Sequence, residues 1–359
     1  MSGTSLDGVD GVLARIAPSG RTQVLAHSSL SLPEHLRQQL LELNTSGHDE
    51  LHRSALAAHA LTHCYADVVG QLLAETALTA AQVCAIGAHG QTVRHQPRLA
   101  QPYTLQIQQP ALLAELTGID VVADFRSRDL AAGGQGAPLV PAFHLEAFGR
   151  SGCRVAVLNI GGIANLSLLP GDGSALGWDC GPGNALIDHW CQQHLGQAYD
   201  QDGAWAAQGK VHTRLLASLL EEPFLQASPP KSTGRDLFNP AWLQAHLDRH
   251  PASPIDVQAT LTAFTAHSIA QDFRRHAPHC RTLLVCGGGA FNRTLMQRLQ
   301  DLLPQVQVED TGLHGLPPQQ VEAAAFAWLA HKCVRRETAS LPSVTGARGA
   351  RVLGALYPR

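Results

Sequence analysis

Hydrophobic positions along the chain follow two different periods, and the two periods alternate from one end of the sequence to the other. Short runs rich in β-branched and aliphatic residues predict strands, among them 84–90, 103–108 and 120–126. Apolar residues three and four positions apart predict long amphipathic helices over 51–75, 254–276 and 319–334. Strands that alternate with helices indicate an α/β fold rather than an all-α or all-β one.

The chain of 359 residues is longer than one hydrophobic core normally supports, so two domains are expected. A segment rich in Gly, Pro and Arg, from about residue 120 to 150, is where we expect the chain to cross between them. We predict an N-terminal α/β domain over 1–127 and a C-terminal α/β domain over 128–334. Residues 335–359 are expected to pack back on the first domain.

Composition narrows the range of functions. The net charge is −3, no run of Lys or Arg is present and aromatic residues make up 5%, which argues against a nucleic-acid-binding protein. The eight cysteines include no CxxC pair, so a zinc knuckle or a redox pair is not indicated. Because the chain has no signal peptide and no apolar run long enough to cross a membrane, we expect a cytoplasmic protein.

The opening stretch "GTSLDG" has the composition of a phosphate-binding turn. Gly3 and Gly8 allow backbone N–H groups to converge on an anion, and Thr4 and Ser5 add hydroxyl donors. Asp7 would repel a phosphate directly, but it could hold Mg²⁺ through water. The same residue types are ordinary turn formers, so a plain hairpin turn is the alternative.

Two further glycine turns follow apolar strands. They are "NIGGIAN", with Gly161 and Gly162, and "CGGGAFN", with Gly287, Gly288 and Gly289. Their glycines permit a ligand to approach the backbone closely, and the second turn begins a predicted helix whose N-terminal amides suit phosphate. Neither turn matches GxxxxGK[ST] or GxGxxG, so P-loop and Rossmann interpretations fail. The first of these turns and the opening stretch share one plan, a glycine turn before an apolar strand, which favours two similar halves that hold a nucleotide between them.

The stretch "GWDCGPGNALIDHW" offers a candidate catalytic carboxylate. We expect Asp179 to end a strand, the following Gly-Pro-Gly to form a rigid turn, and Asn184 to cap the next helix. A carboxylate fixed in this way is well placed to act as a general base. The alternative is that Asp179 itself caps the helix.

Four residues are candidates for binding a polar substrate. His89 and Gln91 follow a predicted strand, in the position where α/β proteins keep ligand contacts. Arg126 could pair with a substrate carboxylate, and Glu322 could accept hydrogen bonds from sugar hydroxyls. The alternatives are a structural histidine, pairing of Arg126 with neighbouring aspartates, and a solvated Glu322.

Taken together and in this order, these stretches resemble the anhydro-N-acetylmuramic acid kinases. The segments that carry the resemblance are "MSGTSLDGVDG", "GAHGQTVRHQP", "ADFRSRDLAAGGQGAPLVPAFH", "NIGGIAN", "GWDCGPGN", "STGRDLF" and "CGGGAFN". The resemblance implies a two-domain actin-like, ribonuclease H-like kinase fold with an interdomain nucleotide cleft, ATP and Mg²⁺ as cofactors, and a homodimer. The implied substrate is 1,6-anhydro-N-acetylmuramic acid, a cell-wall fragment recovered in peptidoglycan recycling.

By the same resemblance, Asp179 would take a proton from the water that attacks C1 of the sugar, and the released O6 would attack the γ-phosphate. The ATP-binding residues would be the glycines of the two later turns and Gly3, Thr4, Ser5, Leu6, Asp7, Gly8, Val9 and Asp10. Asp7 would lie near the metal. Members of the family carry a short apolar strand before this loop, and a chain without it is expected to hold the loop less firmly.

Two other functions compete with this interpretation. One is a kinase of the same superfamily that acts on a different sugar or acid, which product analysis would distinguish. The other is a catalytically silent, nucleotide-binding protein with an actin-like fold, which would bind ATP without turning over the anhydro-sugar. The carboxylates at positions 7 and 179 argue against the silent protein.

Overall fold

The computed structural model describes residues 1–3, 6, 8–17, 20–234 and 237–359. The chain forms two compact units, one of residues 1–147 with 320–359 and the other of residues 148–319. This division differs from the predicted boundary at residue 127. The reason is that residues 129–135 are bonded to the C-terminal segment: Thr345 Oγ1 donates to the buried Asp129 Oδ1 at 2.8 Å, and Gln135 N donates to Thr345 O at 2.9 Å.

The described residues of the first unit form three small sheets. β1 (Gly8–Ile16) pairs with β2 (Thr22–Ser31), and β4 (Gln91–Gln96) pairs with β5 (Tyr103–Ile107), both antiparallel. The third sheet has the order β12 (Ala355–Tyr357), β6 (Val121–Ala123), β3 (Ile86–Gly87). The strand predicted at 84–90 is therefore much shorter than expected. Gly87 approaches the backbone of the helix at Phe326 so closely that a Cβ would lie 2.2 Å from its carbonyl oxygen.

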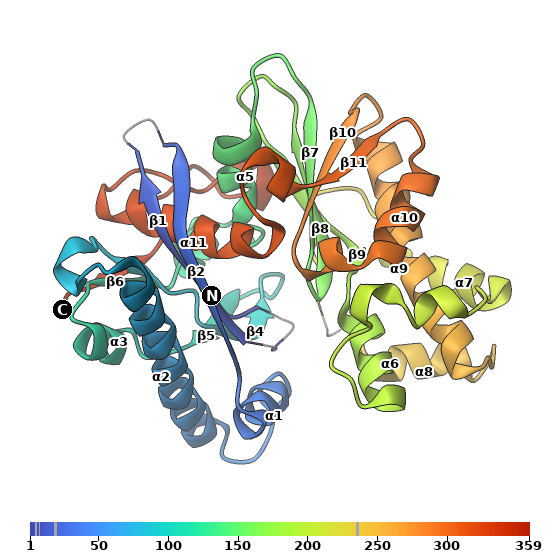
Figure 1. Cartoon of the computed structure of the whole chain (residues 1–359), viewed down its shortest axis with the longest axis horizontal. Helices are drawn as coiled ribbons and strands as arrows, with labels where there is room; N and C mark the ends of the chain where they lie inside the picture. The colour runs from blue at the N-terminus through green and yellow to red at the C-terminus, as the bar shows by residue number, and fades with distance from the viewer. Residues whose placement is uncertain (4–5, 7, 18–19, 235–236) are drawn as a thin grey trace. The chain divides into compact units, whose positions relative to one another are not determined.

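The helices of the first unit pack around these sheets (Figure 1). They are α1 (Glu34–Glu42), α2 (Glu50–Thr76), α3 (Pro110–Thr117), α4 (Ser127–Ala131), α5 (Val140–Phe148, which reaches the unit boundary), α11 (Val321–Val334) and α12 (Pro342–Thr345). The predictions of helices over 51–75 and 319–334 are confirmed by α2 and α11. α11 lies against β1 and β3, so it belongs to the first unit and not to the predicted C-terminal domain.

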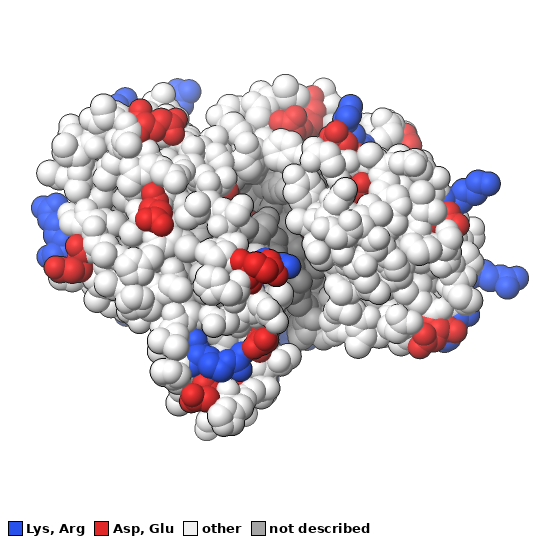
Figure 2. Space-filling view, turned by 60° about the horizontal axis from the view of Figure 1, so that its bottom comes forward, with Lys and Arg blue, Asp and Glu red and all other residues white. Residues whose placement is uncertain are grey.

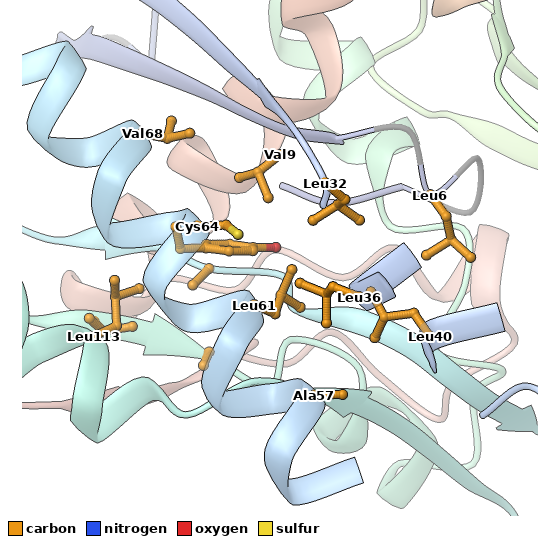
Figure 3. Packing of buried hydrophobic residues seen from close by; sticks show 14 of the residues in the cluster. Leu6, Val9, Leu32, Leu36, Leu40, Ala57, Leu61, Cys64, Val68 and Leu113 are labelled. Carbon is orange, nitrogen blue, oxygen red and sulfur yellow. The ribbon is translucent and has the colours of Figure 1, made fainter. Parts of the chain in front are cut away.

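The core of the first unit is built on one face of α2. Leu61, Cys64 and Val68 follow helical spacing and point toward Val9 of β1 and the helix α1 (Figure 3). The helix comes very close to β1 at Gly11, where a Cβ would lie 2.4 Å from Val68 Cγ1. A glycine at this position therefore allows α2 to cover the hairpin.

The second unit contains one five-stranded sheet of order β11-β10-β7-β8-β9. Its strands are β7 (Val155–Ile160), β8 (Ile163–Leu169), β9 (Leu176–Pro182), β10 (Thr282–Cys286) and β11 (Gln307–Asp310). β8 runs antiparallel to β7 and β9, whereas β10 is parallel to β7 and β11. Only β8, the second of these strands along the chain, runs opposite to the other four. This strand order and direction are those of the ribonuclease H-like domains that build actin-like kinases.

The second unit also contains five α-helices among its described residues. They are α6 (Ala185–Leu195), α7 (Thr213–Leu220), α8 (Pro240–Leu247), α9 (Pro254–His276) and α10 (Arg293–Leu302). α9 has the predicted bounds: Ser253 caps it, Pro254 occupies the first turn, and Arg274, Arg275 and His276 lie in the last turn. The apolar face of the sheet packs with α9 and α10 in one hydrophobic core.

Charged side chains of both signs are scattered among neutral residues over the face seen in Figure 2. Among the described residues, no helix combines the length and the apolar character that crossing a bilayer requires.

Candidate functional site

A row of polar side chains crosses the sheet of the second unit. The strand register places Asp179 of β9 opposite Asn165 of β8, Asn165 opposite Asn159 of β7, and Asn159 opposite Cys286 of β10. Residues directly opposite each other project from the same face of a sheet. Their neighbours along the strands, such as Trp178, belong to the core on the other face. The polar row therefore lies on the face that α9 and α10 do not cover.

Asp179 is half-buried and held at two points. Thr233 N donates to Asp179 Oδ2 at 2.9 Å, and Asp179 N donates to Lys231 O at 3.1 Å. The prediction that Asp179 ends its strand is wrong, because β9 continues to Pro182. A capping role for its side chain is also excluded by this position within the ladder. The rigid support that was expected from a turn comes instead from the strand and from residues 231–233.

The turn at Gly161–Gly162 is fastened to the start of α6. Gly183 N and Ala185 N donate to Gly162 O at 2.9 and 3.1 Å, and Asn184 N donates to Gly161 O at 2.8 Å. A Cβ on Gly183 would lie 2.3 Å from Gly161 O, so the two segments can approach only at a glycine.

Asn184 occupies the N-cap position of α6, as predicted, but its side chain makes no capping hydrogen bond. Its Nδ2 instead donates to Ile160 O at 3.2 Å, because the carbonyl at the end of β7 lies within its reach. The predicted capping by the side chain is therefore wrong, and the side chain serves to join β7 to α6.

The glycine turn after β10 lies beside the first one. Gly287 has a φ of +79°, and a Cβ there would lie 2.4 Å from Asn159 Oδ1. The chain then forms a 3-10 helix over Gly288–Phe291, and α10 begins only at Arg293, capped by Asn292 Oδ1. The expectation that these glycines open the α-helix itself is thus wrong, because Asn292 already satisfies an amide of that helix.

Two glycines of these turns border open space. The nearest atom to a Cβ on Gly161 would be 3.8 Å away, and the nearest to a Cβ on Gly288 would be Asn184 Nδ2 at 3.6 Å. Gly161 is half-buried and Gly288 is exposed. A ligand can approach the backbone closely at both positions, which is the property that the sequence predicted for them.

The opening loop belongs to the first unit, and Thr4, Ser5 and Asp7 lie outside the described residues. The ends of the loop are braced by Ser2, which forms a bridge with Val9, and by Met1 O, which accepts from Asp10 N at 2.8 Å. Ser2 Oγ also lies 3.1 Å from the Tyr65 hydroxyl.

The predicted ATP-binding residues of this loop differ in whether their side chains or only their backbone groups are available to a ligand. The side chains of Leu6 and Val9 are buried in the core, so only their backbones remain for a ligand. Gly8 approaches β2 so closely that a Cβ would lie 2.7 Å from Leu30 O. Leu6 N donates to Gly3 O at 3.3 Å, and the carboxylate of Asp10 lies 3.6 Å from His27 Nε2.

His89 and Arg126, predicted separately, are in direct contact. Arg126 Nη2 lies 2.8 Å from His89 Nε2 and Arg126 Nε lies 3.1 Å from it, while Arg126 Nη1 donates to Gly136 O at 2.8 Å. Burial, together with the charge of Arg126, holds the pKa of His89 well below its ordinary value. A neutral imidazole can accept from the guanidinium at Nε2 when Nδ1 donates to Gly90 O, 2.7 Å away. His89 is thus placed to orient Arg126 rather than to contact a substrate.

Glu322 is brought to the same side of the first unit by α11. The ring of His89 packs on Phe326, with 4.6 Å between the ring centroids. Glu322 precedes Phe326 by four residues, so both project from one face of the helix. Glu322 is half-buried. Gln91 is buried and donates from Nε2 to Thr92 O at 3.4 Å, and within the described part of the chain its Oε1 has no hydrogen-bond partner.

Sequence reasoning missed several residues that the structure places around Asp179. Asn159 and Asn165 lie on either side of a glycine turn, and two asparagines within apolar strands are a signal in themselves. Asn165 Oδ1 is buried and has no hydrogen-bond partner among the residues that the structure describes. Nothing in the sequence pairs Lys231 with Asp272.

No group of three or more His, Cys, Asp or Glu side chains within the described ranges could hold a metal ion. Asp7, the metal ligand predicted from the sequence, lies outside those ranges.

A family model and curated relatives both match the whole chain. A family model described as "Anhydro-N-acetylmuramic acid kinase" matches residues 1–359. Proteins of that name from Variovorax paradoxus and Cupriavidus pinatubonensis are 61% and 56% identical to this chain, covering all of it and 97% of each relative. Among solved structures, the chain aligns with the activator of the 2-hydroxyisocaproyl-CoA dehydratase from Clostridium difficile at a TM-score of 0.45 and 10% identity, over 87% of this chain and 88% of that one.

Proposed function

The chain belongs to the anhydro-N-acetylmuramic acid kinase family, a family of phosphotransferases, and from that premise we propose its reaction and the roles of its residues. The chain opens 1,6-anhydro-N-acetylmuramic acid by adding water and transfers the γ-phosphate of ATP to O6. The products are N-acetylmuramic acid 6-phosphate and ADP, as peptidoglycan recycling requires.

The observation that carries this proposal is the fixed carboxylate of Asp179 within the polar row. In the anhydro-sugar O6 is bonded to C1, so position 6 has no free hydroxyl to accept a phosphate. Asp179 removes a proton from the water that attacks C1, and the C1–O6 bond breaks with its electron pair on O6. O6 then attacks the γ-phosphate, the bond between the γ-phosphorus and the oxygen that bridges it to the β-phosphate breaks, and ADP leaves. One base thereby serves both the hydrolysis and the transfer. A carboxylate held by the Thr233 amide has little freedom to leave the attacking position.

The three glycine turns supply the proposed nucleotide contacts. Gly161 and Gly288 border open space at which phosphate oxygens can approach backbone N–H groups, and Asn184 adds an amide side chain between them. The loop from Gly3 to Asp10 contributes further backbone amides. Positioning and charge neutralisation are the main sources of rate acceleration in phosphoryl transfer.

Mg²⁺ is the expected partner of ATP, and Asp7 is the proposed residue that holds it, through one carboxylate and water. When bound, the ion would neutralise charge on the phosphates.

Residues of the first unit are the proposed contacts for the sugar. Arg126 binds the lactyl carboxylate through its fork of N–H donors, and His89 keeps the guanidinium in place. Glu322 accepts hydrogen bonds from sugar hydroxyls. Gln91 Oε1 and Asn165 Oδ1 are acceptors without a partner among the described residues, so each can bind a donor of the substrate or a water.

The direct test is incubation of the chain with ATP, Mg²⁺ and 1,6-anhydro-N-acetylmuramic acid in ¹⁸O-water, followed by mass spectrometry. A phosphorylated sugar that carries the label at C1 is the expected product. Phosphorylation of a different sugar would favour another kinase of the superfamily, and ATP binding without product would favour a silent nucleotide-binding protein.

Asp179→Asn tests the assignment of the base. Nucleotide binding should stay nearly unchanged, and kcat should fall about 10²–10⁴-fold, as expected for the loss of a general base. Asp248→Asn is the matched control, because Asp248 is exposed at the C-terminal end of α8, where its Oδ1 accepts a hydrogen bond from Gln244 Nε2. Turnover by Asp179→Asn equal to that of the control would remove Asp179 from the mechanism.

A homodimer and a cytoplasmic location complete the proposal. Sedimentation velocity of the purified chain would distinguish a dimer from a monomer.

A further inference from the structure

A short segment lies along the free edge of β9, which is an outer strand of the sheet. Its residues 231–233 bond twice to Asp179. Lys231 O accepts from the backbone N–H of Asp179, and the N–H of Thr233 donates to the carboxylate at 2.9 Å. The position of this segment therefore sets where the carboxylate points.

The side chain of Lys231 leaves the segment toward the opposite face of the sheet, where α9 lies. Its Nζ donates to Asp272 Oδ1 of α9 at 3.1 Å and lies 2.9 Å from Oδ2, with side-chain exposures of 2% and 1%. Nζ also lies 3.5 Å from Phe224 O and 4.9 Å from the centroid of the Phe224 ring. Lys231 is thus held in the interior by the carboxylate of Asp272 and by the carbonyl and the ring of Phe224.

Other titratable groups lie near this pair. Cys180 of β9 lies beside it, and burial raises the pKa of that thiol well above its ordinary value. Burial likewise raises the pKa of Asp272, although Lys231 opposes the shift, and His276 of α9 is a further titratable neighbour. A deeply buried ion pair costs desolvation energy that apolar residues of similar size do not, so folding alone gives a weak reason to keep one.

We propose that the Lys231–Asp272 ion pair is a positioning device for catalysis, which fixes residues 231–233 against β9 and through them orients the carboxylate of Asp179. The inference rests on the proposed role of Asp179 as the base. Lys231 and Asp272 touch neither substrate nor nucleotide in this scheme, so they are positioning residues. Their effect is expected in kcat and not in the binding of either substrate.

The test replaces both charges at once with apolar residues, in the double variant Lys231→Met/Asp272→Leu. We expect thermal stability equal to or above that of the wild type. We expect kcat to fall at least tenfold, because small displacements of a catalytic group have large effects on rate, while KM for ATP and for the anhydro-sugar stays within about twofold. Hydrogen–deuterium exchange of a peptide covering residues 230–234 should become faster in the double variant.

A second variant tests the hydrogen bond between residue 233 and Asp179 without changing the Lys231–Asp272 ion pair. Thr233→Pro removes the N–H that Asp179 accepts and leaves the ion pair intact, so its kcat should fall in the same way. Asp200→Asn is the control for a buried carboxylate in the same unit with a structural task, since Asp200 accepts from Trp205 N and Ala206 N. It should lower thermal stability and leave kcat of the folded protein unchanged.

The outcomes separate this inference from the proposed function. A folded double variant and a folded Thr233→Pro variant that both turn over within twofold of the wild type, while Asp179→Asn is inactive, would overturn the positioning role alone. Turnover by Asp179→Asn at the wild-type rate would overturn the assignment of the base, and the inference with it. Loss of kcat in both variants with unchanged KM values would support it.

Discussion

Gly288 and Gly289 are neighbours in one turn, yet the structure predicts opposite consequences for an added methyl group. A Cβ on Gly288 would meet nothing closer than Asn184 Nδ2 at 3.6 Å, whereas a Cβ on Gly289 would lie 2.3 Å from Ile160 Cγ2. Neither glycine has a positive φ, so the alanine backbone itself is unstrained at both positions. The two substitutions therefore differ in what the methyl group contacts.

Gly289→Ala should destabilise the fold, because β7 must move to relieve the overlap with Ile160. Overpacking of this kind costs about 1–3 kcal/mol. In a domain of the size of the second unit, this corresponds to a fall in Tm of about 3–10 °C. Gly288→Ala should leave Tm unchanged or slightly raised, since alanine restricts the unfolded chain by about 0.4–1 kcal/mol more than glycine does.

Nucleotide binding should follow the reverse order. The methyl group of Gly288→Ala occupies the space through which a phosphate would reach the backbone, and loss of a hydrogen bond to a charged group costs about 1.5–3 kcal/mol. The Kd for ATP should thus rise about 10–150-fold. Calorimetric titration with Mg²⁺ and ATP measures this, and circular dichroism measures Tm. Wild-type ATP affinity in Gly288→Ala would refute the role of this turn, and a loss of Tm equal to that of Gly289→Ala would refute the packing argument.

Two further predictions concern buried histidines. His89→Leu removes the acceptor that orients Arg126, so KM for the anhydro-sugar should rise about tenfold or more while KM for ATP stays constant, and a rise in both would contradict the assignment. His144 is buried and desolvation lowers its pKa to about 3, so below pH 6.5 the unfolded state binds the proton and the folded state does not. From pH 7 to pH 5 this costs about 2 kcal/mol of unfolding free energy, and in urea titrations the loss over this range should be smaller by about that amount in His144→Phe than in the wild type.

Elements whose signals are local were predictable. α9 has the expected bounds because its apolar period, its cap at Ser253 and its basic last turn all lie within one stretch of sequence. The glycine turns were likewise visible, since glycine is required wherever two backbones approach closely. Asp179 could be singled out as a carboxylate in a stretch of small, rigid residues, although the end of its strand could not be located.

The fold class, the glycine turns, the amphipathic helices and the candidate base could thus be inferred from local patterns along the chain. Which side chains meet depends on how the folded segments pack. The polar row depends on the register of strands, a property of pairs of segments and of neither segment alone. The contacts between His89 and Arg126, and between Lys231 and Asp272, join residues about 40 positions apart, and no periodicity links such residues. The place of α11 in the first unit could not be predicted for the same reason. An apolar helix face indicates that the helix will be buried, but its packing partner is known only from the folded chain.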